Sequence, residues 1–159
     1  MNKILGALGK SEKFCEYIKN IENKISPIAI SGLTDVGMVQ MLATTKEFAK
    51  KPICIITYNE IQARKIVEDL NYFTDKVIYL PKKEIVTYDY IAESKDLPYE
   101  RIEALNKIQE MKTGIVVTTV EASIQKMISK KELYKNILKF EVGKEHNLED
   151  VKQKLIDLG

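Results

Sequence analysis

Short apolar runs alternate with longer amphipathic runs along most of this 159-residue chain, and no other feature constrains its fold as strongly. The apolar runs predict four short strands, at residues 28–31, 53–57, 77–80 and 115–119. The amphipathic runs predict helices, at residues 10–24, 37–50, 60–73, 98–111 and 120–128. Strands that alternate with helices form βαβ crossovers, which require parallel strands. The sequence therefore predicts an α/β fold with a parallel sheet flanked by helices.

Four of these runs carry specific expectations about burial. Ile53–Thr57 has no charged residue, which is typical of a strand that is covered on both faces. Ile28–Ser31 is expected to be a short buried strand. Asn59 is expected to cap the helix over 60–73, which would turn Ile61, Ile66, Val67 and Leu70 inward. In the helix from Pro98, the residues expected on one side are Ile102, Leu105 and Ile108.

The last part of the chain has a different pattern. Leu138–Val142 is a strand-like run that Gly143 turns, and Leu148–Leu158 has the spacing of a helix. A lone strand and helix cannot form a core of their own. We therefore expect residues 1–136 to form one domain and residues 137–159 to begin a second α/β domain.

Charge and composition exclude several kinds of protein. There are 25 Lys and Arg residues against 23 Asp and Glu residues, and the two signs are interspersed, so a strongly basic DNA-binding arm is excluded. DNA contact inside a larger assembly remains open. Cys15 and Cys54 are too few for a disulfide framework and are expected to be buried free thiols. His146 is the only histidine and is expected in a surface loop, which leaves no Ser-His-Asp or Cys-His catalytic centre.

Nothing in the sequence indicates a membrane segment. No run of 18 apolar residues occurs, and the first residues lack the core of a signal peptide. We expect a soluble cytoplasmic protein without a membrane partner.

The turn after the first predicted strand has the glycine spacing of a phosphate-binding P-loop. Gly32 and Gly37 are separated by four residues, but Met38 and Val39 stand where that loop needs Lys and then Ser or Thr. Asp35 adds a negative charge where a phosphate would lie. A simple tight turn explains the glycines equally well. We therefore expect no catalytic residue, no metal and no bound cofactor, with Gly32, Gly37, Met38 and Val39 as a vestigial P-loop.

Two segments resemble one known family. Within residues 84–105, an acid, a Tyr-Asp pair, a serine and an arginine follow one another as Glu84, Tyr88, Asp89, Ser94 and Arg101. This pattern resembles the N-terminal module of the bacterial transcription-repair coupling factor family (Mfd). The segment 140–159, with its glycines and leucines at Gly143, Leu148, Leu155 and Gly159, is similar to the start of the family's second domain.

A related helicase subunit, UvrB, is the main alternative family for this motif. It shares the Tyr-Asp-Tyr of residues 88–90 but carries a P-loop Lys and Thr and inserts an aromatic β-hairpin that probes DNA. Here only Ile91–Leu97 separates Tyr90 from Pro98, which leaves no room for that hairpin. The alternatives that remain are a UvrB-like or helicase-type P-loop NTPase half that still binds nucleotide, and a RecA-like protein-interaction domain unrelated to repair.

The resemblance to the coupling factor carries implications for fold and function. It implies a degenerate RecA-like first domain that acts as a non-hydrolysing, UvrB-like scaffold in transcription-coupled nucleotide excision repair and positions a UvrA-recruiting domain. It also implies docking onto the rest of a longer protein. That protein would be an ATP-dependent DNA translocase, whose ATP, Mg²⁺, RNA polymerase and DNA sites lie in domains absent from this sequence.

The remaining candidates have ordinary structural explanations. Tyr88, Tyr90 and Tyr99 could stack on bases, but nearby acids favour packing instead. Asp89 and Arg101 are expected to form a surface or half-buried ion pair. Glu121 is expected to interact with a helix dipole. The lysine pairs at 82–83 and 130–131 are expected to be solvated.

Overall fold

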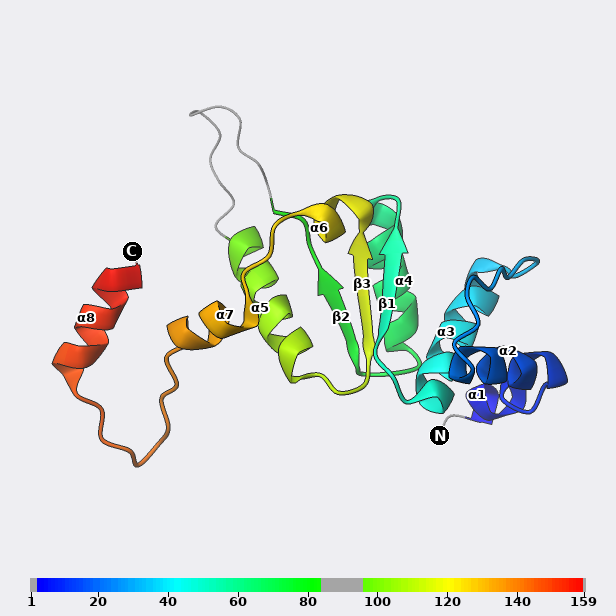
Figure 1. Cartoon of the computed structure of the whole chain (residues 1–159), viewed down its shortest axis with the longest axis horizontal. Helices are drawn as coiled ribbons and strands as arrows, with labels where there is room; N and C mark the ends of the chain where they lie inside the picture. Colours follow the sequence, from blue (N-terminus) through cyan, green and yellow to red (C-terminus); the bar gives the residue numbers. More distant parts are fainter. Residues whose placement is uncertain (1–2, 84–95, 159) are drawn as a thin grey trace. The chain divides into compact units, whose positions relative to one another are not determined.

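Three parallel strands form the sheet, in the order β1-β3-β2 (Figure 1). The computed structural model describes residues 3–83 and 96–158. The strands are β1 (Ile53–Thr57), β2 (Val77–Leu80) and β3 (Ile115–Thr119). Ile115 of β3 pairs with Ile53 on one side and with Val77 on the other. The predicted α/β fold with a parallel sheet is confirmed.

Helices cover both faces of this sheet. On one face α4 (Glu60–Asn71) packs its buried Ala63, Ile66 and Leu70 against Ile115 and Val117 of β3. On the other face α5 (Asp96–Glu110) packs Ala104 against Leu80 and Val116. All five residues of β3 are buried because this strand has a neighbour on each side and a helix on each face.

Three further helices extend the core beyond the sheet. They are α1 (Lys3–Leu8), α2 (Glu12–Glu22) and α3 (Asp35–Ala49). α1 and α2 pack on α3, and α3 packs on α4. Leu5, Val39 and Ala43 thereby join the same hydrophobic core as Leu70. The phenyl rings of Phe14 and Phe48 meet edge to face, with their centroids 5.6 Å apart.

The predicted strand at Ile28–Ser31 is wrong. The segment belongs to no strand of the described sheet, and the Ile30 side chain is 47% exposed. The segment follows α2 and lines a groove with α2 and α3. Its apolar residues therefore lie near helices, and none of the three described strands pairs with them.

The predicted coverage of β1 on both faces is also wrong. Ile53 and Ile55 pack on the core, but Cys54 is exposed and Ile56 is 56% exposed. β1 lies at the sheet edge, and α5 packs against β2 rather than β1. The alternate side chains of β1 on the α5 face are consequently left uncovered.

Three other burial predictions need correction. Cys15 is free as predicted, but it is exposed, because the residues that α2 buries are Phe14 and Ile18. Ile61 is 81% exposed in the first turn of α4, whereas Ile66 and Leu70 point inward as predicted. Ile102 is 52% exposed, because the part of α5 that packs on the sheet is formed by Leu105, Ile108 and their neighbours.

After β3, the described residues form three helices and no strand. α6 (Val120–Ile124) ends earlier than predicted, and α7 (Lys130–Asn136) and α8 (Leu148–Leu158) follow. The strand predicted at Leu138–Val142 is wrong, because Phe140 and Val142 are exposed and no described strand pairs with this segment.

The chain divides into two compact units, Met1–Gln125 and Lys126–Gly159. The predicted domain boundary after residue 136 stays a prediction. His146 is exposed in a loop, as expected, and its ring lies 5.1 Å from that of Phe140 between centroids.

Leu70 gives a direct test of this core. Leu70→Ala is expected to lower the free energy of unfolding by about 2–5 kcal/mol, since it removes a fully buried side chain and leaves a cavity. Urea denaturation of the chain measures this loss. Ile61→Ala, on the same helix but exposed, should change the value by less than about 0.5 kcal/mol. Equal losses in the two variants would contradict the assigned faces of α4.

Candidate functional site

The turn with P-loop spacing leads directly into a capped helix. Gly32 has a φ of 79°, a left-handed conformation that favours glycine. The chain then reaches α3, which starts at Asp35, before the predicted start at 37. The Thr34 hydroxyl accepts a hydrogen bond from the Gly37 N–H at 3.2 Å, and the Met38 N–H donates to the Thr34 carbonyl at 2.8 Å. These amides at the helix start therefore already have partners within the chain.

The two side chains at the chemically decisive positions lie in the core. Val39 is almost completely buried beside Ala43 and Ala63. Met38 is half-buried and packs against the same cluster. Neither side chain can supply the charge or the hydroxyl that a P-loop places at those positions.

Asp35 pairs with a lysine of the neighbouring helix. Its carboxylate lies 3.4 Å from the Lys65 Nζ of α4, and both side chains are exposed. An exposed pair of this kind contributes little to stability. It places one acid and one base on the surface beside the turn.

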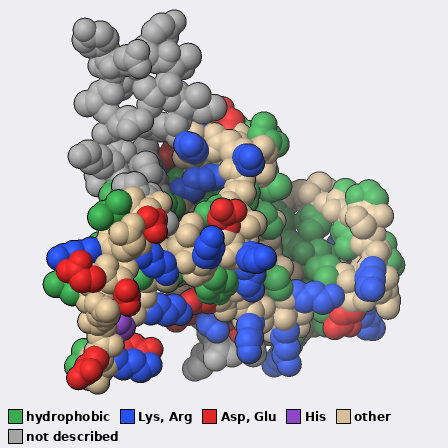
Figure 2. Space-filling view, turned by 60° about the vertical axis from the view of Figure 1, so that its left-hand side comes forward, with side chains coloured by type: hydrophobic (Ala, Val, Ile, Leu, Met, Phe, Trp, Pro, Cys, Tyr) green, Lys and Arg blue, Asp and Glu red, His purple; other side chains and the backbone are tan. Residues whose placement is uncertain are grey.

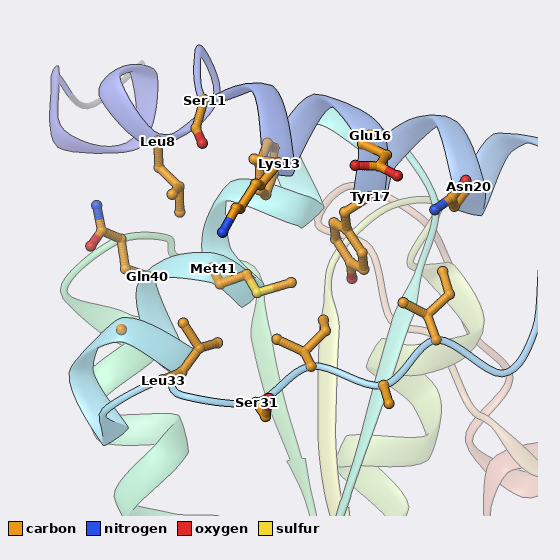
Figure 3. A pocket seen from close by; sticks show the side chains of 15 residues that line it. Leu8, Ser11, Lys13, Glu16, Tyr17, Asn20, Ser31, Leu33, Gln40 and Met41 are labelled. Atoms are coloured by element: carbon orange, nitrogen blue, oxygen red, sulfur yellow. The ribbon is translucent and has the colours of Figure 1, made fainter.

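A groove runs between α2 and the extended segment that leads into the turn (Figure 3). Its volume is about 660 Å³, and Lys13, Glu16 and Tyr17 of α2 lie along one side of it. Ser31 and Leu33 lie on the opposite side, and Met41 of α3 lies between the two sides. The lining is mostly apolar with one base and one acid, and thus lacks the concentrated positive charge of a phosphate site.

A second set of polar contacts ties the carboxyl end of β2 to α6. The Lys82 Nζ lies 2.7 Å from a Glu121 carboxylate oxygen. The Lys83 N–H donates to the Gln125 Oε1 at 2.6 Å, and the Gln125 Nε2 donates back to the Lys83 carbonyl at 2.9 Å. We call these four residues, Lys82, Lys83, Glu121 and Gln125, the β2–α6 clasp. The clasp fixes the path of the chain where it leaves the sheet.

Arg101 of α5 also binds the two segments that the clasp joins. It is only 7% exposed, and its guanidinium donates to the carbonyls of Pro81 and Ala122. Burial lowers the pKa of Arg101, because desolvation disfavours the charged form. One side chain thereby links α5, the end of β2 and α6.

Tyr79 on β2 has a distinct environment. The Arg64 guanidinium carbon lies 4.8 Å from the centre of its ring, a cation–π arrangement. Burial, together with the negative charge of Glu60, raises the pKa of Tyr79 to about 12. The phenol of Tyr79 is therefore harder to ionise than that of an exposed tyrosine.

Most residues of the family-like motif lie outside the described residues. These are Glu84, Tyr88, Asp89 and Ser94. Arg101 is described, and it contacts carbonyl oxygens in a buried position rather than the surface. Its predicted pairing with Asp89 stays a prediction. The structure therefore places Gly32 in the turn before α3, places Gly37, Met38 and Val39 in the first turns of α3, and places Arg101 apart from them, at the clasp.

Sequence reasoning missed three polar contacts. The Thr34 cap had a signal, since a threonine just before an amphipathic run is a common helix N-cap. The bonds between Gln125 and Lys83 join residues far apart in the chain, so no local pattern announces them. Glu121 does lie in the first turn of α6, as expected, but it also pairs with Lys82.

Basic and acidic side chains are interspersed on the face shown in Figure 2. The lysines at 82–83 and 130–131 are exposed, as expected, and Tyr99 is exposed on α5. Within residues 3–83 and 96–158, no cluster of three or more His, Cys, Asp or Glu side chains is arranged to hold a metal ion. None of the helices in these ranges has the length and apolar character needed to span a membrane.

Comparison with known proteins identifies similar sequences but no matching family model. The chain is 24% identical over 162 residues to the transcription-repair-coupling factor of Bacillus subtilis (strain 168), an alignment that covers 100% of the chain and 14% of that protein. It is also 24% identical over 159 residues to the transcription-repair-coupling factor of Staphylococcus aureus (strain MRSA252), with 98% of the chain and 13% of that protein covered. The chain thus spans about one seventh of these relatives.

Arg101→Met tests the link between α5, β2 and α6. The variant keeps most of the buried volume but leaves the Pro81 and Ala122 carbonyls without this donor, so we expect a loss of about 1–3 kcal/mol in the free energy of unfolding. Arg64→Met, at a half-exposed arginine of α4, should lose less than about 1 kcal/mol. Urea denaturation compares the two variants. A larger loss for Arg64→Met would contradict the structural role assigned to Arg101.

Proposed function

We propose that this chain is a scaffold module of a transcription-repair coupling factor acting in transcription-coupled nucleotide excision repair. The observation that carries this proposal is the similarity to transcription-repair-coupling factors, which extends over the whole chain. A short motif could arise by chance. An alignment that covers the whole chain indicates common ancestry more strongly. The role of the relatives in coupling transcription to repair is therefore the best guide to the role of this chain.

We propose further that residues 1–136 form a RecA-like first domain of the UvrB-homology type, and that residues 137–159 begin the domain that recruits UvrA. The parallel sheet with helices on both faces supports the first assignment, because RecA-like domains are built from such βαβ units. The amphipathic α8, with Leu155 and Ile156 exposed, supports the second, because such a face belongs against further protein.

The module is proposed to work without binding or hydrolysing nucleotide. The Gly37 amide bonds to Thr34, Val39 lies in the core, and Met38 packs against it. A UvrB-like NTPase would need a lysine in place of Met38 and a serine or threonine in place of Val39. The geometry of this turn thus favours the scaffold over the helicase-type alternative.

The partners follow from the same proposal. UvrA would bind through the second domain, and RNA polymerase and DNA would bind through other domains of a longer coupling factor. ATP and Mg²⁺ would belong to its translocase domains, and the protein would act in the cytoplasm. The part played by this chain would be to hold the UvrA-recruiting domain and to dock against the rest of the protein.

Nucleotide titration tests the non-hydrolysing role. Isothermal titration of the chain with Mg-ATP and then with ADP is expected to give no binding heat up to millimolar nucleotide. Asp35→Asn, which removes the negative charge from the turn, should give the same result because the Gly37 amide remains bonded to Thr34. Micromolar binding by the parent chain would contradict the scaffold role and favour a helicase-type NTPase half.

Capture of UvrA tests the repair assignment. A coupling factor that contains this sequence and the complete second domain is expected to retain purified UvrA on an affinity matrix. The present 159-residue chain is the matched control and should retain none, since most of the proposed second domain lies outside it. Failure of the longer protein to retain UvrA would favour a RecA-like interaction domain unrelated to repair.

A further inference from the structure

Positive charge is concentrated in one short segment of the second compact unit. Residues 126–139 contain five lysines and one acid, whereas residues 140–159 contain three lysines and five acids. Elsewhere along the chain, no stretch of equal length carries so large an excess of lysine and arginine over acids. The nearly balanced overall charge therefore hides one basic segment. We call residues 126–139 the α7 basic segment, and its lysines are Lys126, Lys130, Lys131, Lys135 and Lys139.

The lysines of this segment are exposed, and neighbouring acids do not neutralise them. None of the five forms an ion pair with an acid in residues 3–83 or 96–158. In the same unit, by contrast, the Lys144 Nζ lies 2.7 Å from a Glu141 carboxylate oxygen, and the Lys152 Nζ lies 3.0 Å from one of Glu149. The α7 basic segment thus keeps a positive charge that is offset elsewhere in the unit.

Helix α7 arranges part of this charge on one surface. Its Leu133 is buried, which fixes the side of the helix that faces the protein. Lys131 and Lys135 are separated by one helical turn and lie together on the opposite side. Lys130 and Tyr134 are also one turn apart, and the Lys130 Nζ lies 5.7 Å from the centre of the Tyr134 ring. The exposed side of α7 therefore presents three ammonium groups and one aromatic ring.

The chemistry of this surface favours the backbone of duplex DNA. A lysine ammonium group is a point charge that binds phosphate oxygens, whereas carboxylate recognition favours the planar fork of arginine, which this segment lacks. Duplex DNA carries one negative charge per about 1.7 Å of its axis, so lysines one helical turn of about 5.4 Å apart meet phosphates without a matched geometry. An acidic protein surface would have to place its few carboxylates to fit these lysines.

We infer that the α7 basic segment binds the phosphate backbone of duplex DNA. Contacts between ammonium groups and phosphates carry no base information, so the binding is independent of DNA sequence. It is also weak, because five lysines reach only a few phosphates. The inference goes beyond the proposed function, which assigns DNA to other domains of a longer protein, and it does not rest on that function.

A salt titration tests the contact with phosphates. Fluorescence anisotropy measures binding of the 159-residue chain to a labelled duplex of arbitrary sequence and about 20 base pairs, which is longer than so small a patch can cover. We expect a Kd of about 10–100 µM at about 50 mM salt, and a slope of about −3 to −4.5 for the logarithm of the association constant against that of the salt concentration. Absence of binding at low salt, or an affinity that salt does not change, would overturn the inference.

Two double variants locate the contact. Lys131→Gln with Lys135→Gln should weaken DNA binding about 10-fold and make the salt slope shallower by about 2, because it removes two phosphate contacts. Lys144→Gln with Lys152→Gln is the matched control, since it removes the same net charge from the same unit, and should weaken binding less than about 2-fold. All four lysines are exposed, so neither variant should shift the midpoint of urea denaturation. Equal weakening in both variants would refute the assigned segment.

Two competitors separate this inference from its alternatives. Polyglutamate should displace the duplex only at a large excess of charge, and displacement at equal charge would instead indicate an acidic protein partner and overturn the inference. Tighter binding of a single strand that is lost in Tyr134→Ala would indicate a base-stacking site and contradict the duplex. UvrA capture and nucleotide titration involve no DNA. A chain that fails to bind the duplex would therefore refute this inference and leave the proposed function standing.

Discussion

The rest of this structure depends on the complete burial of β3. All five residues from Ile115 to Thr119 are buried: β1 pairs with the whole strand, β2 pairs with Ile115 to Thr118, and helices cover both faces of the sheet. The two threonines at its end are buried with their polar atoms bonded: the Thr118 hydroxyl donates to the Leu80 carbonyl, and the Thr119 hydroxyl accepts from the Ala122 N–H. Buried polar groups without partners would cost about 1–3 kcal/mol each, so these bonds allow the strand to end inside the protein. They also start α6 at a fixed place, on which the β2–α6 clasp then depends.

The clasp and Arg101 extend this order to the chain segments that leave the sheet. Lys83 and Gln125 exchange two hydrogen bonds, and Arg101 joins the ends of β2 and α6 through their carbonyls. The partners of the buried Arg101 guanidinium in the described residues are carbonyl oxygens and not carboxylates. The exposed pair of Lys82 and Glu121 adds a contact that salt would weaken. Hydrogen-bond geometry rather than ionic attraction thus dominates the position of these segments.

Local sequence patterns predicted the elements well and their surroundings poorly. The strands at Ile53, Val77 and Ile115 and the Asn59 cap follow from β-branched composition and from capping chemistry, which act over a few residues. The placement of Ile28–Ser31 and Leu138–Val142 fails because a strand exists only where another strand offers its edge, and that is not encoded locally. The predicted burial of Ile61 is wrong because periodicity does not show where along a helix the packing begins. In the candidate site, the unusual residues of the turn were evident from spacing, whereas the contacts of Arg101 required the folded arrangement.

The Thr34 cap makes helix stability and anion binding competing uses of one amide. An anion that approached the turn would meet a Gly37 N–H already engaged by a hydroxyl of the same chain. To gain that donor it would have to displace the cap, and loss of an N-cap costs about 1 kcal/mol. The Thr34 hydroxyl belongs to the same chain as the Gly37 amide. Its competition with an anion for that amide therefore does not weaken when the protein is diluted. Selectivity against phosphate at this turn would then be a by-product of how α3 begins.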